Sequence, residues 1–292
     1  MKPFVSVIIP VYRDWPSLLE CLRALSAQTY AQGEIEVIVV NNTPEEPCPF
    51  ELPAANMKLI AERKKSAYAA RNAGVRAAKG SILAFTDADC QPDPGWVENG
   101  VRCLLEQGVS LVGGMVDFAF HNAGSAAEML DVATHMDNQR SIQRYKAAVT
   151  ANLFVKRSVF NTVGLFNENL QSGGDISLTQ KAFAQGFEIA YCPKARVTHP
   201  TRGLKEGWQK LNRVASGQKL LLKQMPGSWV RKTKVLALHL IPLANPFRVL
   251  STMRHYGNNS AWMFVRVMLL SVLMGLVYDV FLLKSLLFSE RH

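Results

Sequence analysis

Apolar residues recur along the first half of the chain in two alternating patterns. Short runs of β-branched and aliphatic residues alternate with longer stretches in which leucine or alanine returns every three or four positions. The short runs are typical of strands buried on both faces of a sheet, and the periodic stretches are typical of amphipathic helices. We therefore expect strands at Val5–Ile9, Glu36–Val40, Met57–Ala61, Ser81–Thr86, Ser110–Val116 and Val149–Val155, and helices at Ser17–Gln28, Ala67–Ala78 and Pro94–Gln107.

This alternation predicts an α/β fold with an open, mostly parallel sheet that is covered by helices on both faces. The segment Phe118–Lys146 interrupts it with a polar, irregular pattern, and we expect this insertion to shape an acceptor site. Ligands of such sheets bind at the carboxyl ends of the strands. Three polar groups follow predicted strands and are therefore candidates for the site: Pro10–Asp14, Asn41–Thr43 and Asp87–Cys90.

Two carboxylates follow the strand that ends at Thr86. Asp87 and Asp89 are separated by one residue and precede the proline-containing turn Gln91–Pro94. Oxygen ligands at this spacing could hold a divalent cation that bridges to a diphosphate and neutralises charge on a leaving group. A solvated turn that caps the following helix is the alternative, and spacing alone does not decide between the two.

Five motifs, taken in order, resemble the family 2 glycosyltransferases of the GT-A fold. The motifs are Val5–Tyr12, Val37–Asn42, Ala70–Gly74, Ala78–Gly80 and Phe85–Asp89, and the resemblance covers about residues 4 to 200. It implies an inverting transfer from a nucleoside diphosphate sugar, with Mg²⁺ or Mn²⁺ as cofactor. The implied acceptor is a hydroxyl group of a glycan, a polysaccharide or a lipid-linked sugar.

Matched position by position, the resemblance also implies roles for single residues. The donor nucleotide is implied to lie beside Pro10, Tyr12, Asn41 or Asn42, Arg71, Asn72 and Asp87, and the metal ion on Asp89 with Asp87 nearby. Many relatives carry an aspartate in the Asn41–Asn42 pair, which accepts a hydrogen bond from the uracil N–H. An amide can both donate and accept a hydrogen bond, so the identity of the donor nucleotide stays open. Without the resemblance, a strand-end turn would explain the asparagines, and a solvated helix face would explain Arg71.

A further candidate lies in the segment Leu170–Leu178. Asp175 resembles the family's catalytic base, which accepts the proton of the acceptor hydroxyl. Relatives often carry Glu-Asp followed by a second aspartate two residues on, and here those flanking positions are Gly174 and Ser177. The alternative is that Asp175 only caps the helix that follows it.

Two weaker candidates complete the predicted site. Asn152 matches the strand that lines the acceptor side in relatives and could bind a sugar hydroxyl. His199 follows the last predicted strand and is either a third metal ligand, a diphosphate contact or a structural histidine.

Other enzyme classes fit the motifs less well. A dinucleotide-dependent oxidoreductase needs a glycine-rich turn after the first strand, and Val11–Trp15 contains no glycine. The sequence also has no Walker A motif, which excludes the P-loop NTPases. A catalytically inactive membrane scaffold of the same fold, and a sugar-1-phosphate nucleotidyltransferase, remain as alternatives.

Charge is unevenly distributed over the 292 residues. Residues 1–200 carry 19 Lys and Arg against 20 Asp and Glu, whereas residues 201–292 carry 14 against 3. The basic part also contains the long apolar runs Val235–Leu243 and Val267–Phe288, which favour an anionic membrane surface over nucleic acid as the partner. We therefore expect a catalytic domain at 1–200 and a membrane-associated helical region at 201–292.

The mode of membrane association stays open. As a helix, Val267–Phe288 would be roughly 33 Å long, enough to span the hydrocarbon core, but Asp279 weakens insertion. Either a span or an interfacial helix would be held by the basic residues Lys205, Lys210, Arg213, Lys219, Lys223, Arg231, Lys232 and Lys234. The five cysteines form no C-x-x-C pair, so we expect a reducing compartment, on the cytoplasmic face of the inner cell membrane.

Overall fold

The computed structural model describes residues 2–122, 124–224 and 244–287. The chain divides into two compact units. The sheet unit consists of Met1–Phe118, Met136–Leu170 and Gly174–His199, and the helical unit consists of Ala119–His135, Gln171–Gly173 and Pro200–His292.

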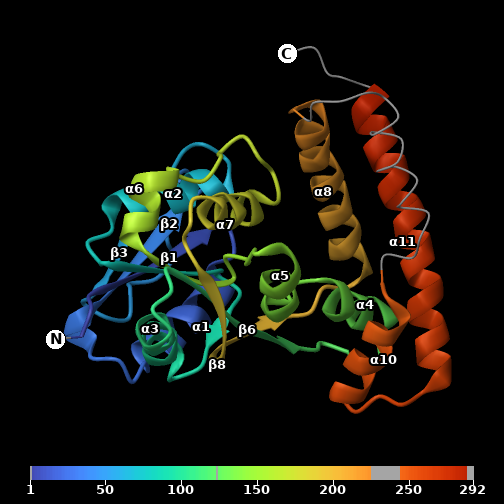
Figure 1. Cartoon of the computed structure of the whole chain (residues 1–292), viewed down its shortest axis with the longest axis horizontal. Coiled ribbons are helices and arrows are strands. Elements are labelled where there is room, and N and C mark those ends of the chain that lie inside the picture. The colour runs from blue at the N-terminus through green and yellow to red at the C-terminus, as the bar shows by residue number, and fades with distance from the viewer. Residues whose placement is uncertain (1, 123, 225–243, 288–292) are drawn as a thin grey trace. The chain divides into compact units, whose positions relative to one another are not determined.

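A single mixed sheet forms the centre of the sheet unit (Figure 1). Its strand order is β3-β2-β1-β4-β7-β6-β8-β5. The strands are β1 (Val5–Val11), β2 (Ile35–Asn41), β3 (Met57–Ala61), β4 (Ile82–Thr86), β5 (Gln91–Pro92), β6 (Leu111–Ala119), β7 (Asn152–Lys156) and β8 (Ile189–Pro200). Strands β3, β2, β1 and β4 are parallel, as the βαβ pattern predicts, and β7 pairs antiparallel with both β4 and β6.

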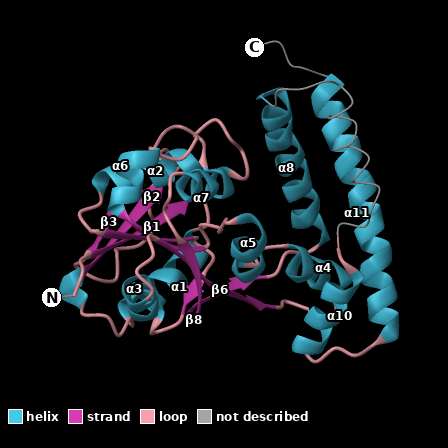
Figure 2. Cartoon of the chain, viewed as in Figure 1, coloured by secondary structure: helices cyan, strands magenta, loops and turns pink. Residues whose placement is uncertain are grey.

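Helices cover both faces of this sheet. Figure 2 shows α2 (Ala67–Ala77) and α6 (Arg157–Val163) on one side, and α1 (Trp15–Ser26) and α3 (Trp96–Glu106) on the other. Alternate residues of β1 supply the two cores: Val5 and Val7 pack in the cluster that includes α1, whereas Ile8 faces Gly74 of α2. A Cβ at Gly74 would lie 2.4 Å from Ile8 Cγ2, so this glycine sets how closely α2 approaches the sheet.

The parallel strands bring the predicted polar groups to one edge. Val11, the last residue of β1, pairs with Asn41, the last residue of β2, and Asn42 donates its backbone N–H to the carbonyl of Val11. Strand β4 lies on the other side of β1 and ends at Thr86, directly before Asp87. The carboxyl ends of three neighbouring strands therefore carry the candidate residues.

The insertion differs from the sequence expectation. Phe118–Lys146 is not irregular but contains helices α4 (Ala126–Thr134) and α5 (Asn138–Tyr145). Ser125 caps α4 by accepting from the N–H of Glu128, whose carboxylate in turn accepts from the N–H groups of His121 and Asn122. Ser125 thus caps the first turn and Glu128 satisfies two N–H groups of the preceding turn, which starts a helix that the overall polarity of the segment conceals.

Among the described residues of the helical unit, the helices that pack around an apolar cluster of their own are α4, α8 (Leu204–Gln224), α10 (Pro246–His255) and α11 (Ala261–Leu287). Met129 of α4, Val249 of α10 and Val267 of α11 are buried in this cluster. The ring of Trp208 on α8 meets that of Phe281 on α11 edge to face, with centroids 5.4 Å apart.

Helix α11 is long and apolar enough to cross a membrane. The candidate span is Ala261–Leu282. Its most apolar stretch of 18 residues has a mean hydropathy of 2.0, and 33% of that stretch is buried. One such helix is weak evidence by itself, because the core helix of a soluble protein passes the same test. The predicted apolar run Val235–Leu243 and the basic residues Arg231, Lys232 and Lys234 lie outside the described residues, as does Phe288.

Candidate active site

Asp87 is held by an arginine from the neighbouring helix. Arg71 Nη2 donates to Asp87 Oδ1 over 2.5 Å, and the side chain of Arg71 is 7% exposed. The Nε of Arg71 is buried and has no hydrogen-bond partner among the described residues. The unused donor is enclosed, whereas the Asp87 carboxylate is 26% exposed, so Asp87 is the part of the pair that a ligand can reach.

A second cluster joins the end of β4 to the end of β8. Asp89 Oδ2 lies 3.3 Å from His199 Nε2, and the Cys90 thiol adds a ligand atom within 4.8 Å of both. His199 and Cys90 are buried, whereas Asp89 is partly exposed. Burial, followed by the charge of Asp87, raises the pKa of the Cys90 thiol, so it stays protonated at neutral pH. The cluster thus presents one carboxylate and one imidazole toward a possible cation.

Asp175 lies at the start of α7 (Gly174–Ala184), inside its first turn. Its Oδ1 accepts from the Ile176 N–H at 3.0 Å and from the Tyr68 hydroxyl at 3.4 Å, and its Oδ2 accepts from the Thr150 N–H at 3.2 Å. The carboxylate is therefore fixed from three sides rather than engaged in capping alone. Since each oxygen has two lone pairs, Oδ2 keeps one for a further donor.

Tyr68 links this carboxylate to the Arg71–Asp87 pair. It stands one turn before Arg71 on α2, and the Arg71 guanidinium lies 5.7 Å from the centre of its ring. The Tyr68 hydroxyl accepts from the Gly174 N–H at 2.8 Å. Burial, together with the charge of Asp175, raises the pKa of Tyr68 well above its ordinary value, so its O–H remains a donor. Asp87, Arg71, Tyr68 and Asp175 form one continuous chain of contacts.

Pro10 and Tyr12, two of the residues predicted to lie beside the nucleotide, stand at the end of β1 and directly after it. Pro10 is partly buried in the strand, and Tyr12 follows it with 51% of its surface exposed. The guanidinium of Arg13 lies 5.4 Å from the centre of the Tyr12 ring and pairs with Glu46. An exposed aromatic ring at the carboxyl edge of the sheet is available for stacking on a flat ligand.

The amides of Asn41 and Asn42 are occupied by the neighbouring loops. Asn41 accepts from the Thr43 N–H and donates to the carbonyl of Glu46. Asn42 donates to the carbonyls of Glu62 and Lys64, and its side-chain oxygen accepts from the Ser66 N–H. Both are buried, and these bonds match the strand-end turn that we gave as the alternative to a base contact.

The amides of Asn72 and Asn152 are engaged within the sheet unit. Asn72 is 1% exposed and holds the next loop, because its amide donates to the Phe166 carbonyl and its oxygen accepts from the Phe166 N–H. Asn152 is fully buried: it accepts from the Trp96 indole N–H and donates to the carbonyls of Met115 and Ala195. These bonds give both amides a structural role, and their contact with donor or acceptor stays a prediction.

One residue of the site, Tyr68, escaped the sequence analysis. It could have been found, because it precedes Arg71 by three positions and such residues share a helix face. Cys90 lies within the candidate group Asp87–Cys90, but its approach to His199 could not be expected from the sequence, since it depends on how β8 returns to the sheet.

Comparison with known proteins assigns the chain to a family. The model of glycosyl transferase family 2 matches residues 6–164. The chain belongs to this family. Glycosyltransferase AglE of Haloferax volcanii is 37% identical over 300 residues, which cover 99% of this chain and 98% of that protein. The pre-mycofactocin glycosyltransferase of Mycobacterium tuberculosis is 25% identical over 70% of this chain and 44% of its own length.

A solved structure supports the fold of this family 2 glycosyltransferase. The mannosyltransferase PcManGT from Pyrobaculum calidifontis, in complex with GDP-Man and Mn²⁺, matches with a TM-score of 0.63 at 18% identity, covering 98% of this chain and 88% of that one. The predicted GT-A fold and the glycosyltransferase class are thereby confirmed.

Proposed function

We propose that this glycosyltransferase moves a sugar from a nucleoside diphosphate sugar to an acceptor hydroxyl with inversion, and that Asp175 is the base. The observation that carries the proposal is the placement of the Asp175 carboxylate, which is fixed by Tyr68, Thr150 and its own helix and keeps one lone pair on Oδ2. A base held in this way can accept the hydroxyl proton of the acceptor as the new bond forms.

The donor is proposed to lie at the carboxyl edge of β1 and β4. Tyr12 offers an exposed ring for the base, and the partly exposed Asp87 carboxylate, held by Arg71, is available to the ribose. The similarly folded mannosyltransferase was solved with GDP-Man, which supports a nucleotide-sugar donor.

A divalent cation fits the residues at the end of β4. Asp89 supplies a hard oxygen and His199 a nitrogen, a donor pair that Mn²⁺ accepts readily and Mg²⁺ also tolerates, and Asp87 lies two residues before Asp89. When bound, the ion would neutralise charge on the departing diphosphate. The role of the protein is to hold Asp89 against His199, so that the carboxylate is oriented before the donor arrives.

The helical unit is proposed to hold the enzyme at the cytoplasmic face of a membrane. Helix α11 exposes a stripe of large apolar side chains along its length, which we call the α11 stripe: Trp262, Val265, Leu269, Val272, Leu273, Leu276 and Val280. Such a stripe is unfavourable in water and suits lipid. Asp279, whose Oδ1 is buried without a hydrogen bond among the described residues, counts against full insertion.

Carbonate extraction distinguishes a membrane-spanning helix from an interfacial one. A spanning protein stays in the membrane pellet, whereas an interfacial protein is released.

Glycosyl transfer is tested with labelled UDP-, GDP- and dTDP-sugars and an extract of glycan and lipid-linked acceptors. We expect transfer from one of these donors, and we expect excess chelator or Asp89→Ala to abolish it. Asp93→Ala is the matched control, because Asp93 is a nearby carboxylate outside the cluster, and it should retain activity. An inactive scaffold would bind a donor without turnover, and activity that persists in excess chelator would overturn the metal proposal.

A further inference from the structure

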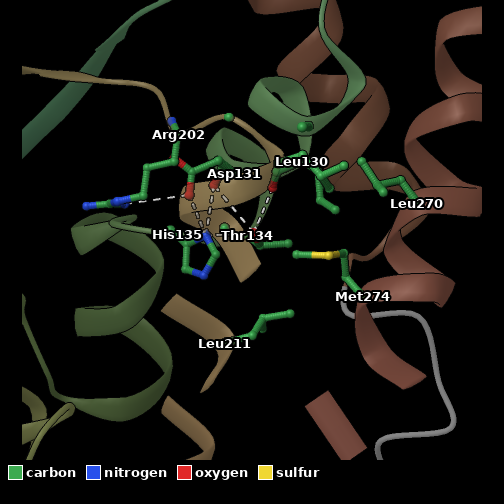
Figure 3. Close-up of a pocket in the computed structure, with 12 residues that line it drawn as sticks. Leu130, Asp131, Thr134, His135, Arg202, Leu211, Leu270 and Met274 are labelled. Atoms are coloured by element: carbon green, nitrogen blue, oxygen red, sulfur yellow. Dashed lines mark hydrogen bonds and ion pairs between the residues drawn. The ribbon is translucent and has the colours of Figure 1, made fainter. Parts of the chain in front are cut away.

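A cavity of the helical unit is lined on one side by polar groups that contact one another (Figure 3). Asp131 Oδ1 lies 2.9 Å from His135 Nδ1, and Asp131 Oδ2 accepts from the Arg202 N–H at 3.0 Å. The facing side is apolar and consists of Leu211, Leu270 and Met274. Since this buried carboxylate is compensated by side chains of its own unit, the cluster fits a role in holding the helices together.

A buried hydroxyl in the sheet unit, that of Tyr68, contacts the proposed base instead. Tyr68 is 7% exposed, and its hydroxyl oxygen accepts from the Gly174 N–H at 2.8 Å. The same hydroxyl donates to Asp175 Oδ1 at 3.4 Å, which is long for a hydrogen bond between two oxygens. The stronger hold is therefore on the backbone of Gly174, and Tyr68 fixes the main chain that carries Asp175 as well as its carboxylate.

The two oxygens of the Asp175 carboxylate have different surroundings. Oδ1 accepts from the Ile176 N–H at 3.0 Å and from the Tyr68 hydroxyl, so two donors face its two lone pairs. Oδ2 accepts from the Thr150 N–H at 3.2 Å and keeps a lone pair. By occupying Oδ1, Tyr68 leaves Oδ2 as the oxygen that can take a proton.

The ring of Tyr68 is held from two sides. It stacks on Phe166, with ring centroids 5.9 Å apart, and the Arg71 guanidinium lies 5.7 Å from its centre. Asn72, on the same helix as Tyr68, binds both the N–H and the carbonyl of Phe166. These contacts fix the direction of the ring, so the hydroxyl is kept against Gly174.

Gly174 leaves the room that this ring occupies. A Cβ at Gly174 would lie 2.7 Å from Tyr68 Cζ and 2.8 Å and 2.9 Å from Cε2 and Cε1. These distances are too short for two carbon atoms, so a side chain at this position would displace the ring. The sequence departs here from the Glu-Asp pattern of relatives, and the departure is the one that lets Tyr68 reach the base.

We propose that Tyr68 is the positioning residue of the base, and that Gly174 is the glycine that admits it. The hydroxyl holds the start of α7 so that Asp175 Oδ2 stays available to the acceptor hydroxyl, and it takes no proton itself. The proposal rests on the proposed role of Asp175 as the base.

Tyr68→Phe tests this role in the full-length enzyme, because it removes the hydroxyl and keeps the ring. Transfer is measured from the UDP-, GDP- or dTDP-sugar that the wild type uses, with a fixed amount of acceptor extract and a varied donor concentration. We expect kcat to fall about ten- to a hundredfold and the KM for the donor to change less than about threefold. Tyr30→Phe is the matched control, because Tyr30 is also buried and its hydroxyl donates to the Pro3 carbonyl, ahead of β1; it should keep kcat.

A second variant displaces the ring without changing Tyr68. Gly174→Ala should lower kcat by a similar factor, since its methyl group meets the ring, whereas Gly33→Ala, with open space around it, should keep kcat. A normal kcat in Tyr68→Phe or in Gly174→Ala, or a loss confined to the KM for the donor, would overturn the positioning role.

A double variant shows whether Tyr68 acts through Asp175. If it does, Tyr68→Phe should slow transfer by Asp175→Asn less than about twofold, because the base it positions is already gone. A further tenfold loss would refute the positioning role. Near-normal transfer by Asp175→Asn would refute the base, and the positioning role with it, whereas a slow Asp175→Asn beside a fast Tyr68→Phe would refute the positioning role alone.

Discussion

Replacement of Asn152 by alanine tests whether this residue is structural. The substitution removes the acceptor of the Trp96 indole N–H and the donor to the carbonyls of Met115 and Ala195, all in the fully buried centre of the sheet unit. Each buried polar group that loses its partner costs about 1–3 kcal/mol. Since the three losses are coupled and partly relieved by relaxation, we expect a total of about 3–6 kcal/mol.

Thermal unfolding in detergent, followed by far-UV circular dichroism, measures this loss. For a domain of this size, about 2–4 °C of melting temperature corresponds to 1 kcal/mol, so Asn152→Ala should lower the melting temperature by roughly 6–24 °C. Asn161→Ala, on the exposed face of α6, is the control and should leave it nearly unchanged. A normal melting temperature combined with a raised KM for the acceptor would refute the structural assignment and restore the acceptor role.

Two further predictions concern packing and charge. Gly74→Ala should destabilise the enzyme by about 1–3 kcal/mol, because its Cβ would overlap Ile8, whereas Gly33→Ala, with open space around it, should be neutral in the same melting assay. Burial lowers the pKa of Lys210 to about 7 in the folded enzyme, whereas an unfolded lysine keeps its proton up to about pH 10.5, so stability should rise with pH between these values. Lys210→Met should flatten that part of the pH profile of the melting temperature, and an unchanged profile would show that the folded protein does not bury this ammonium.

The parallel half of the sheet could be predicted because its signals are local. A buried run such as Val5–Ile9, ended by proline or asparagine, indicates by its own residues that it is a buried strand and where that strand ends. The helix between two such runs indicates that the two strands are parallel. The antiparallel return of β7 between β4 and β6 has no comparable signal, since it follows from long-range pairing.

The residues of the candidate site also differ in how far the sequence predicts their roles. Asp87, Asp89 and Asp175 stand at the ends of strands or the start of a helix, and their roles are implied by the ordered motifs that resemble the family. For the asparagines the sequence leaves two roles open, because an amide at a strand end serves a loop or a ligand equally well. Only the partners of Asn72 and Asn152, which lie far away in the sequence, show that these amides are occupied.

The transfer rate and donor affinity of Asp175→Asn test the central claim most directly. The amide keeps the size of the side chain, and its single oxygen can replace one carboxylate oxygen as acceptor, toward either Tyr68 or Thr150, but it cannot take the proton of the acceptor hydroxyl. We expect donor binding, measured by calorimetry, to stay within a few-fold of the wild type, while transfer falls by about 10²–10⁴. Near-normal transfer by this variant would contradict the account and leave Asp175 as a structural residue at the start of α7.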